Sequence, residues 1–188
     1  MTTSTQTSLD FQHEPGLFAF LQYQCTLSDA PALGYHIHKA EQPFLEAIEF
    51  DLEARACVRK AARQTGGTTL FCAMAWHYHL MGYQVAVSTS NHSMLNIMRR
   101  VLEGVEVLGF KPIPNGSSDR IHLSTIGGMH RPPHPIRLIV TGRDYYDAFK
   151  GQTYDFIFID NVSPGNQPSA TRAGMKHITQ KVVLNVTP

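Results

Sequence analysis

The residues best suited to chemistry lie in a glycine-containing stretch at 60–69, which reads KAARQTGGTT. This stretch follows a short run typical of a β-strand, at 54–59, and leads into an apolar helical pattern. Backbone N–H groups at a helix N-terminus lack intrahelical partners, and the helix dipole adds positive potential, so such an end attracts anions. Gly66 and Gly67 let the backbone approach a phosphate with no side chain in the way. Thr68 stands where the hydroxyl group of a phosphate-binding loop reaches a magnesium ion.

A phosphate-binding loop ordinarily carries Lys just before that hydroxyl residue, and Gly67 takes its place here. The cation would then come from Lys60 or Arg63, at the start of the loop. The other loop residues expected to contact a nucleotide are Gln64, Thr65 and Thr69. Taken alone, the loop also suits an ordinary glycine-rich turn between a strand and a helix.

A second candidate lies much later in the chain, where the apolar run YDFIFI ends in Asp160 and Asn161. An aspartate at the end of an apolar strand is the other half of a P-loop nucleotide site, where it holds magnesium, usually through water. A Glu commonly follows it and activates the attacking water. An amide can orient a water molecule but cannot accept its proton, so Asn161 predicts slow or absent hydrolysis. The alternative is a core strand whose Asp caps a turn, but two motifs in this order favour a nucleotide site.

The surrounding pattern alternates between helices and strands. Helices are expected at 42–52, 68–81 and 91–103, and strands at 54–59, 83–88, 121–126, 136–140, 155–160 and 181–186. The last three strands are almost continuously apolar, as strands buried on both faces are. This alternation predicts an α/β fold of P-loop NTPase type, with a mainly parallel twisted sheet that helices cover on both faces. Ligands in such sheets bind at the carboxyl ends of the strands. The stretch 104–135, rich in Gly, Pro and Ser, is expected to be irregular apart from its one strand.

Bulk composition sets the broad class. The chain has 188 residues, 43% of them hydrophobic, which suits one globular domain with a short arm. We expect a tail and arm at 1–37 and one domain at 38–188. The formal net charge of +1 means that any nucleic-acid contact depends on local patches. Three scattered cysteines fit a reducing cytoplasm, and there is no apolar run long enough for a membrane span and no signal-peptide pattern.

Several segments, in order, resemble the ATPase domain of phage terminase large subunits. The stretch HKAEQPFLEAIEFDLEARACVRKAARQTGGTT resembles that domain's opening: a Gln in the first helix, a strand, and a loop of the type Arg-Gln-x-Gly-x-Thr/Ser. YQVAVSTSNHSMLNIMRRVLE resembles its second strand and helix, GQTYDFIFIDN its acidic motif, and KVVLNVTP its strand ending in Thr-Pro. The resemblance spans residues 38–188.

The resemblance implies roles for individual residues. Gln42 would contact adenine, and Thr187 would couple hydrolysis to movement. Arg63, Asp160 and Asn161 would occupy catalytic positions, with Asn161 where the family has Glu. The cofactors would be ATP and Mg²⁺. The partners would be double-stranded DNA, a portal and a small terminase subunit, in the host cytoplasm. A homo-oligomer is left open.

Other readings stay open beside the motor ATPase. Asn161 favours a catalytically inactive P-loop protein with a regulatory or assembly role. A helicase-like nucleic-acid translocase shares the strand–loop–helix start, although no second motor domain is visible in the sequence. Because the chain ends at Pro188, without the acidic cluster of a terminase nuclease domain, no nuclease activity is expected.

Histidine and cysteine positions do not predict a metal site. His77 and His79 are two apart on an expected helix and so point to different sides. His130 and His134 share a proline-rich stretch but lack a nearby Cys or carboxylate. Cys72 is interpreted as a small buried apolar residue.

Basic residues outside the loop have two interpretations. Arg99 and Arg100 fit the solvated side of their helix, or else a contact with a DNA backbone. Arg143 fits a surface loop, or else an arginine finger that faces a neighbouring subunit's nucleotide.

Overall fold

The computed structural model describes residues 42–51, 53–62, 65–104, 111–114, 120–124, 134–141 and 145–188. Its strands are β1 (Ala56–Lys60), β2 (Val85–Thr89), β3 (Lys111–Pro114), β4 (Arg120–Ser124), β5 (Ile136–Val140), β6 (Tyr154–Val162) and β7 (Ile178–Val186). Its helices are α2 (Gln42–Phe50), α3 (Gly67–Leu80), α4 (His92–Gly104), α5 (Tyr145–Phe149), α6 (Gln167–Lys176) and the 3-10 turn η3 (Pro164–Asn166).

The strands form one sheet in the order β1-β7-β6-β2-β5-β4-β3. The first five of these strands run parallel, and β4 and β3 add an antiparallel edge. The predicted α/β fold with a mainly parallel sheet is therefore confirmed. The last strand in sequence, β7, lies between β1 and β6. This insertion separates β1, which leads into the glycine-containing loop, from β6, which carries Asp160. Side chains of β7 therefore lie between the two.

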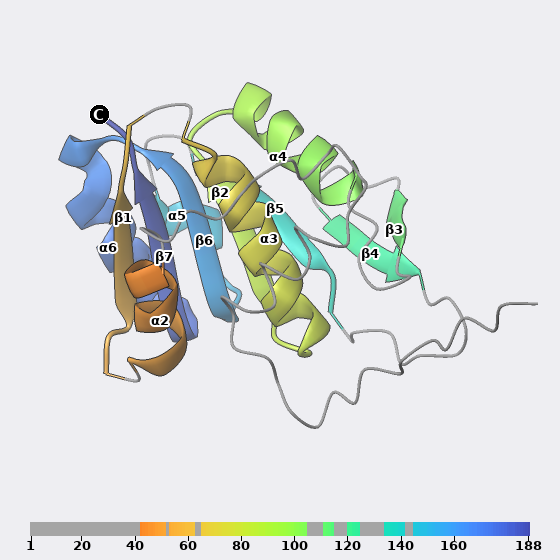
Figure 1. The fold of residues 1–188 in the computed structure, drawn as a ribbon, viewed down its shortest axis with the longest axis horizontal. Coiled ribbons are helices and arrows are strands. Elements are labelled where there is room, and N and C mark those ends of the chain that lie inside the picture. Colours follow the sequence, from red (N-terminus) through yellow and green to blue (C-terminus); the bar gives the residue numbers. More distant parts are fainter. Residues whose placement is uncertain are drawn as a thin grey trace, which may run out of the picture.

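Helices cover both faces of the sheet (Figure 1). On one face α2, α3 and α4 pack over a core that includes Leu45, Phe71, Met98 and Phe158. On the other face α5 and α6 pack over a second core, which includes Phe149 and Ala170. Because the central strands are buried on both faces, their sequences are apolar at consecutive positions rather than alternating.

Helix α3 is the most deeply buried helix among the described elements. Ten of its fourteen residues are buried, in agreement with a sequence that is apolar on most sides. Its aromatic residues reach the sheet: the Tyr78 ring stacks on Phe156 with 3.8 Å between centroids, and Phe71 meets Phe158 edge to face at 5.9 Å. These ring contacts hold α3 against β6 along most of the length of the helix.

Burial of His77 on α3 makes the stability of the protein depend on pH. Desolvation lowers the pKa of His77 from 6.5 to about 4, since burial disfavours the charged form. The folded state thus binds this proton more weakly than the unfolded state. The contribution is fully present above pH 6.5 and is lost as the pH falls through 4. We expect the free energy of unfolding to fall by about 3 kcal/mol between pH 7 and pH 4, at about 1.4 kcal/mol per pKa unit.

Urea unfolding of the native chain across this pH range measures the effect. His77→Gln should flatten the dependence, whereas Ser93→Ala, a change at an exposed position without a titratable group, should leave it unchanged. An equal slope in all three proteins would contradict the assignment to His77.

The structure departs from the sequence-based expectations in three places. The strand expected at 121–126 is present as β4, but a second strand, β3, pairs with it antiparallel and was not predicted. Helices α5 and α6 were not predicted, since their segments are short or interrupted by Gly and Pro rather than clearly periodic. Strands β6 and β7 are longer than the apolar runs that revealed them.

Within the described ranges, no helix combines the length and the apolar character needed to cross a lipid bilayer. The expected tail and arm at 1–37 lie outside the described residues, as do His130 and Arg143.

Candidate nucleotide-binding site

The carboxyl ends of β1, β7 and β6 lie next to one another, beside the N-terminus of α3 (Figure 1). The chain turns from β1 into α3 through Gly66, whose φ of 75° is the left-handed conformation that glycine adopts at low cost. Leu70 N–H donates to Gly66 O at 3.0 Å and closes the first turn of the helix. No side chain caps this N-terminus, and its first turn holds no acidic residue. The helix end is therefore electrostatically suited to an anion.

Two residues predicted as magnesium ligands lie in direct contact. The Thr68 hydroxyl donates to Asp160 Oδ2 at 2.5 Å, which joins the first turn of α3 to the end of β6. Asp160 is 1% exposed. The structure therefore brings the glycine-rich loop and the acidic strand end together, although they lie far apart in the sequence.

The second oxygen of Asp160 is also fully engaged. Asp160 Oδ1 accepts hydrogen bonds from Asn185 Nδ2 at 2.6 Å and from the Asn161 backbone N–H at 2.8 Å. Three donors around a buried carboxylate fix its orientation and satisfy its charge. Position 160 thus presents a rigid anion rather than a mobile side chain.

Arg59 was not identified from the sequence, but it lies beneath the loop. It is 5% exposed. Its Nη1 donates to Asn185 Oδ1 at 2.9 Å, and its Nη2 donates to Thr65 Oγ1 at 3.2 Å. The parallel pairing of β1 with β7 sets Arg59 opposite Asn185. The only sequence signal was alternation: Arg59 shares the buried side of β1 with Cys57.

Asn161 adopts a backbone conformation unusual for a residue other than glycine. Its φ of 57° lies in the left-handed region, which Asn tolerates better than most residues. Thr187 Oγ1 donates to Asn161 Oδ1 at 2.9 Å, and Thr187 N–H donates to Val162 O at 3.0 Å. With its carbonyl oxygen engaged, the Asn161 side chain offers a donating NH₂ group and no basic atom.

A cavity of about 470 Å³ opens between these elements, which is within the range typical of small-ligand pockets. It is lined by Ala62, Thr65, Gly66, Gly67, Thr68, Met94, Asp160, Asn161, Asn185 and Thr187. The chemistry of this lining fits a nucleotide with Mg²⁺: a hydroxyl and a carboxylate are hard oxygen donors, and the glycines expose backbone amides. Among the described residues that line the cavity, Asp160 is the one carboxylate, so none of the others could act as a base beside it.

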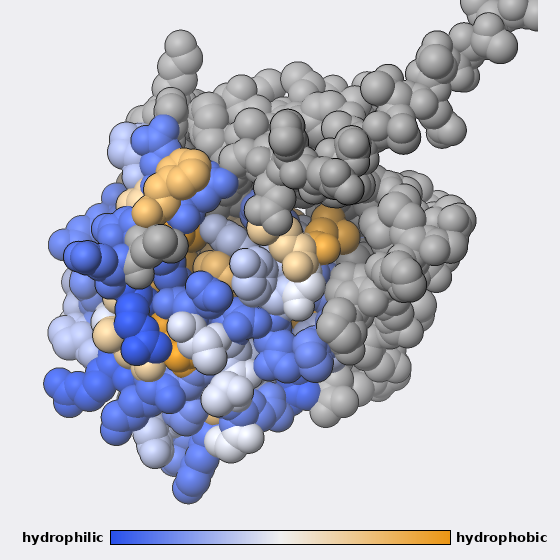
Figure 2. Space-filling model, turned by 90° about the horizontal axis from the view of Figure 1, so that it is seen from below, coloured by the Kyte–Doolittle hydropathy of each residue, from blue (hydrophilic) through white to orange (hydrophobic). Residues whose placement is uncertain are grey.

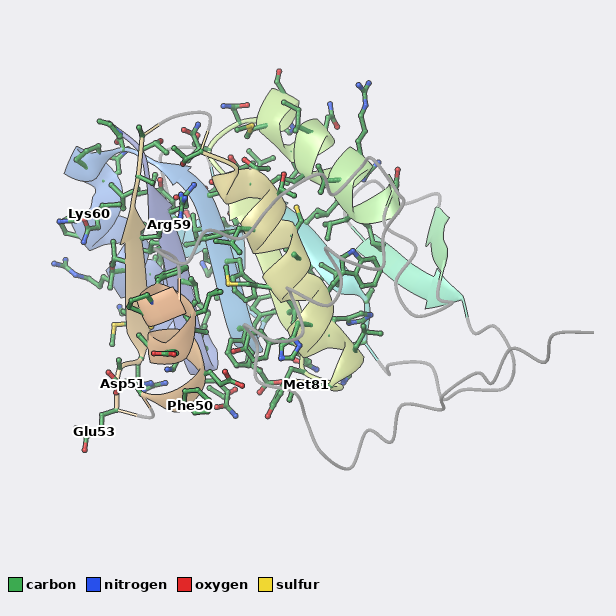
Figure 3. All side chains as sticks on the ribbon, viewed as in Figure 1. Phe50, Asp51, Glu53, Arg59, Lys60 and Met81 are labelled. Atoms are coloured by element: carbon green, nitrogen blue, oxygen red, sulfur yellow. The ribbon has the colours of Figure 1, made fainter. Side chains whose placement is uncertain are left out.

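The remaining predicted site residues are placed differently. Lys60 is exposed and is not among the residues that line the cavity. Figure 3 shows Lys60 and Arg59 on opposite sides of β1. Thr69 is half-buried in the first turn of α3 and also does not line the cavity. Gln42 starts α2, but its side chain lies outside what the structure describes. Arg63 and Gln64 lie outside the described residues.

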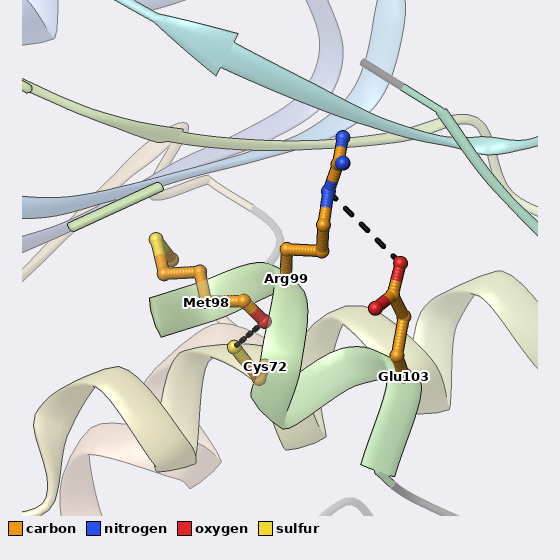
Figure 4. A network of polar contacts seen from close by, with 4 residues as sticks. All are labelled: Cys72, Met98, Arg99 and Glu103. Atoms are coloured by element: carbon orange, nitrogen blue, oxygen red, sulfur yellow. Dashed lines mark hydrogen bonds and ion pairs between the residues drawn. The ribbon is translucent and has the colours of Figure 1, made fainter. Parts of the chain in front are cut away.

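Figure 4 shows the contact of α3 with α4 through Cys72 and Met98. Cys72, one turn after Thr68, is fully buried, and its thiol donates to Met98 O of α4 at 3.7 Å. Burial raises the pKa of the Cys72 thiol well above its usual value, and the charge of Asp160 raises it further. The thiol is therefore unreactive, as expected of a small buried apolar residue. Arg99 lies on the outer side of α4, where its Nε is 4.0 Å from the Glu103 carboxylate.

A second cavity of about 380 Å³ lies at the amino ends of β2, β5 and β6, and is lined in part by Gln84, His134 and Gln152. In the view from below in Figure 2, the described part of this side of the molecule is mainly hydrophilic. Of the described residues of the glycine-containing loop, 60–62 and 65–69, none lines this cavity. In the part of the chain that the structure describes, no group of three or more His, Cys, Asp or Glu side chains is arranged to hold a metal.

Gly67 is required by its neighbours, and its replacement should destabilise the protein. A Cβ atom at this position would lie 2.4 Å from Asn185 Nδ2 and 2.9 Å from Arg59 Nη1. We expect Gly67→Ala to lower the free energy of unfolding by about 1–3 kcal/mol, because both polar groups must shift away from their partners. Urea unfolding measures this effect. Gly165→Ala is the matched control, since nothing lies within 4 Å of a Cβ there. Equal stability of the two variants would contradict the contact at Gly67.

Comparison with known proteins gives similarity at the level of structure only. No protein-family model matches the chain, and no curated protein matches it in sequence. A solved structure of the large terminase ATPase domain of a Thermus phage, in a single-site mutant form, is 18% identical over 86% of this chain and 70% of that chain, with a TM-score of 0.58. The same domain without the mutation is 17% identical over 84% and 68%, with a TM-score of 0.56. The chain therefore has a terminase-like α/β fold.

Proposed function

We propose that this chain binds ATP with Mg²⁺ and is the ATPase-like domain of a viral DNA-packaging motor, with impaired hydrolysis. The domain would comprise residues 38–188. The observation that carries the proposal is the contact of Thr68 with Asp160, because it joins the two halves of a P-loop site within one cavity. The similarity to large terminase ATPase domains supports the motor context.

Each group at the cavity has a role in this proposal. The backbone amides of Gly66 and Gly67 would surround the phosphates, with the positive end of α3 behind them. Thr68 and Asp160 would hold Mg²⁺, which when bound neutralises charge on the phosphoryl oxygens. Asn161 would donate a hydrogen bond to a phosphate or a water, but cannot remove a proton. Hydrolysis would therefore be slow.

Thr187 would transmit the state of the site to the end of β7. Its hydroxyl bonds to Asn161, and its backbone N–H bonds to Val162, so the ends of β6 and β7 are tied together next to the cavity. A change at the phosphates that moves Asn161 would reach Thr187 directly. In the proposed motor this movement would pass to double-stranded DNA, with a portal, a small terminase subunit and further copies of the chain as partners.

Calorimetric titration with ATP, in Mg²⁺ and then in EDTA, tests the binding proposal. Phosphate release is measured in parallel, with and without double-stranded DNA. We expect Mg²⁺-dependent binding and little turnover. The absence of any nucleotide binding in Mg²⁺ would overturn the proposal. Turnover that DNA stimulates in the native chain would support the motor and contradict the impairment.

A second candidate function is an inactive P-loop protein with a regulatory or assembly role. The side chain of Asn161 favours this candidate. Its carbonyl oxygen accepts a hydrogen bond from Thr187, so the group left to meet a ligand is an NH₂, which cannot act as a base. Nucleotide binding without turnover, unaffected by DNA, is the outcome that supports this candidate over the motor.

A further inference from the structure

The space that a side chain at position 67 would need is occupied by two other residues. The terminal nitrogens of Asn185 and Arg59 lie 2.4 Å and 2.9 Å from the place of a Cβ atom on Gly67, closer than real Cβ contacts allow. A lysine, the usual residue at this point of a phosphate-binding loop, would displace both groups. Because residue 67 is a glycine, a cation from another part of the chain occupies the space beside the loop that a side chain at position 67 would fill.

Arg59 is that cation. Its guanidinium keeps its charge at any pH at which proteins fold. It is held beneath the loop by its bonds to Asn185 Oδ1, to Thr65 Oγ1 and, at 3.4 Å, to Thr65 O. With Arg59 only 5% exposed, its charge is screened less by water and salt than a surface charge would be. The positive charge acts on the same loop whose amides face the cavity.

Asn185 connects this charge to the acidic strand. An arginine can only donate hydrogen bonds, and an ionised carboxylate can only accept them. The amide between Arg59 and Asp160 therefore has one permitted orientation, with Oδ1 toward Arg59 and Nδ2 toward Asp160. Asn185 holds the Asp160 carboxylate in the direction of Thr68. It is a positioning residue, whereas Arg59 contributes charge.

We propose that Arg59 supplies, from strand β1, the positive charge for the nucleotide phosphates that Gly67 removes from the loop, and that Asn185 positions Asp160 beside it. This inference rests on the proposed nucleotide site. Because Gly67 has no side chain, only its backbone separates the guanidinium from the amide groups that would contact the phosphates. The substrate class it selects is a nucleoside triphosphate rather than a less charged nucleotide.

The test compares affinities for ATP and ADP in Mg²⁺. Arg59 does not itself line the cavity, so its charge would act through the loop. Arg59→Gln keeps a hydrogen-bond donor but removes the charge, and should weaken ATP binding about 10-fold, the low end of the range for losing an interaction with a charged group. The loss should be smaller for ADP, which carries less charge. Arg59→Lys, which keeps the charge, should recover most of the ATP affinity. A purely structural role would affect both nucleotides equally.

A second variant moves the positive charge from position 59 to position 67, where a phosphate-binding loop usually carries its lysine. In the double variant Arg59→Gln, Gly67→Lys, the guanidinium no longer occupies the space at position 67, but the Asn185 amide must move aside and gives up part of its hold on Asp160, so the recovery is partial. We expect the double variant to regain ATP affinity relative to Arg59→Gln alone. Arg55→Gln is the matched control. Arg55 lies just before the amino end of β1, away from the loop, and its Nη2 donates to Ile178 O at 2.9 Å.

The outcomes separate this inference from the proposed function. If the native chain binds no ATP, the proposed function fails. If the native chain binds ATP and Arg59→Gln binds it equally well, only the role of Arg59 is overturned. The same conclusion follows if Lys60→Met weakens binding while Arg59→Gln does not. Thermal unfolding shows that each variant is folded, and Arg59→Met replaces the Gln variant if that one does not fold.

Discussion

Replacing Asn161 with Asp is expected to raise ATP turnover by about two orders of magnitude or more. A positioned general base contributes about 10²- to 10⁴-fold to a rate, and the amide of Asn161 cannot serve as one. The Asp side chain has the same length and can keep the hydrogen bond from Thr187 Oγ1, now to a carboxylate oxygen. Phosphate release under saturating ATP and Mg²⁺ measures the gain.

Asn161→Glu adds reach but also strain. At a φ of 57° a longer side chain that cannot bond to its own backbone costs about 1–2 kcal/mol more than Asn or Asp. We therefore expect the Glu variant to hydrolyse ATP but to be less stable than the Asp variant. Asn161→Gln is the control for Glu, since it has the same length without a base. If both acidic variants bind ATP but do not exceed the native turnover, the missing base is not what limits hydrolysis.

The second large effect concerns Asp160. Asp160→Asn is expected to remove the Mg²⁺ dependence of ATP binding and to weaken binding in Mg²⁺ by about 100-fold. Hydrogen bonds and charge interactions at a metal-binding carboxylate are worth about 1.5–3 kcal/mol each. The amide oxygen can still accept from Asn185 and Asn161, and its NH₂ group can donate to Thr68. The variant should therefore remain folded while it loses the anion.

Asp155→Asn is the matched control, because it makes the same change on the same strand, β6, but near its amino end. Asp155 accepts from Gln84 N–H at 2.8 Å and from Thr179 Oγ1 at 2.6 Å, away from the cavity. Titrations with ATP in Mg²⁺ and in EDTA should separate the two variants. Equal losses in both would mean that the effect of Asp160→Asn is on the fold and not on a metal site.

Local patterns along the chain were enough to predict the fold class and the two halves of the candidate site. Continuous apolar runs ending at Val140, Asp160 and Val186 identified buried parallel strands, and the carboxyl ends of such strands are where ligands bind. The glycine-rich turn into an apolar helix identified the loop at Gly66 and Gly67. These signals are local, because they depend on the spacing of residue types along the chain.

The position of a buried cation beneath the loop emerged from the three-dimensional structure alone. The basic candidates in the loop sequence were Lys60, which is exposed, and Arg63, which lies outside the described residues; the guanidinium buried beneath the loop is that of Arg59. Insertion of β7 between β1 and β6 places Asn185 opposite Arg59 and next to Asp160. That juxtaposition depends on strand order, which a local pattern does not encode. For the same physical reason, the fit of Arg59 and Asn185 into the space at Gly67 could not be predicted from the sequence.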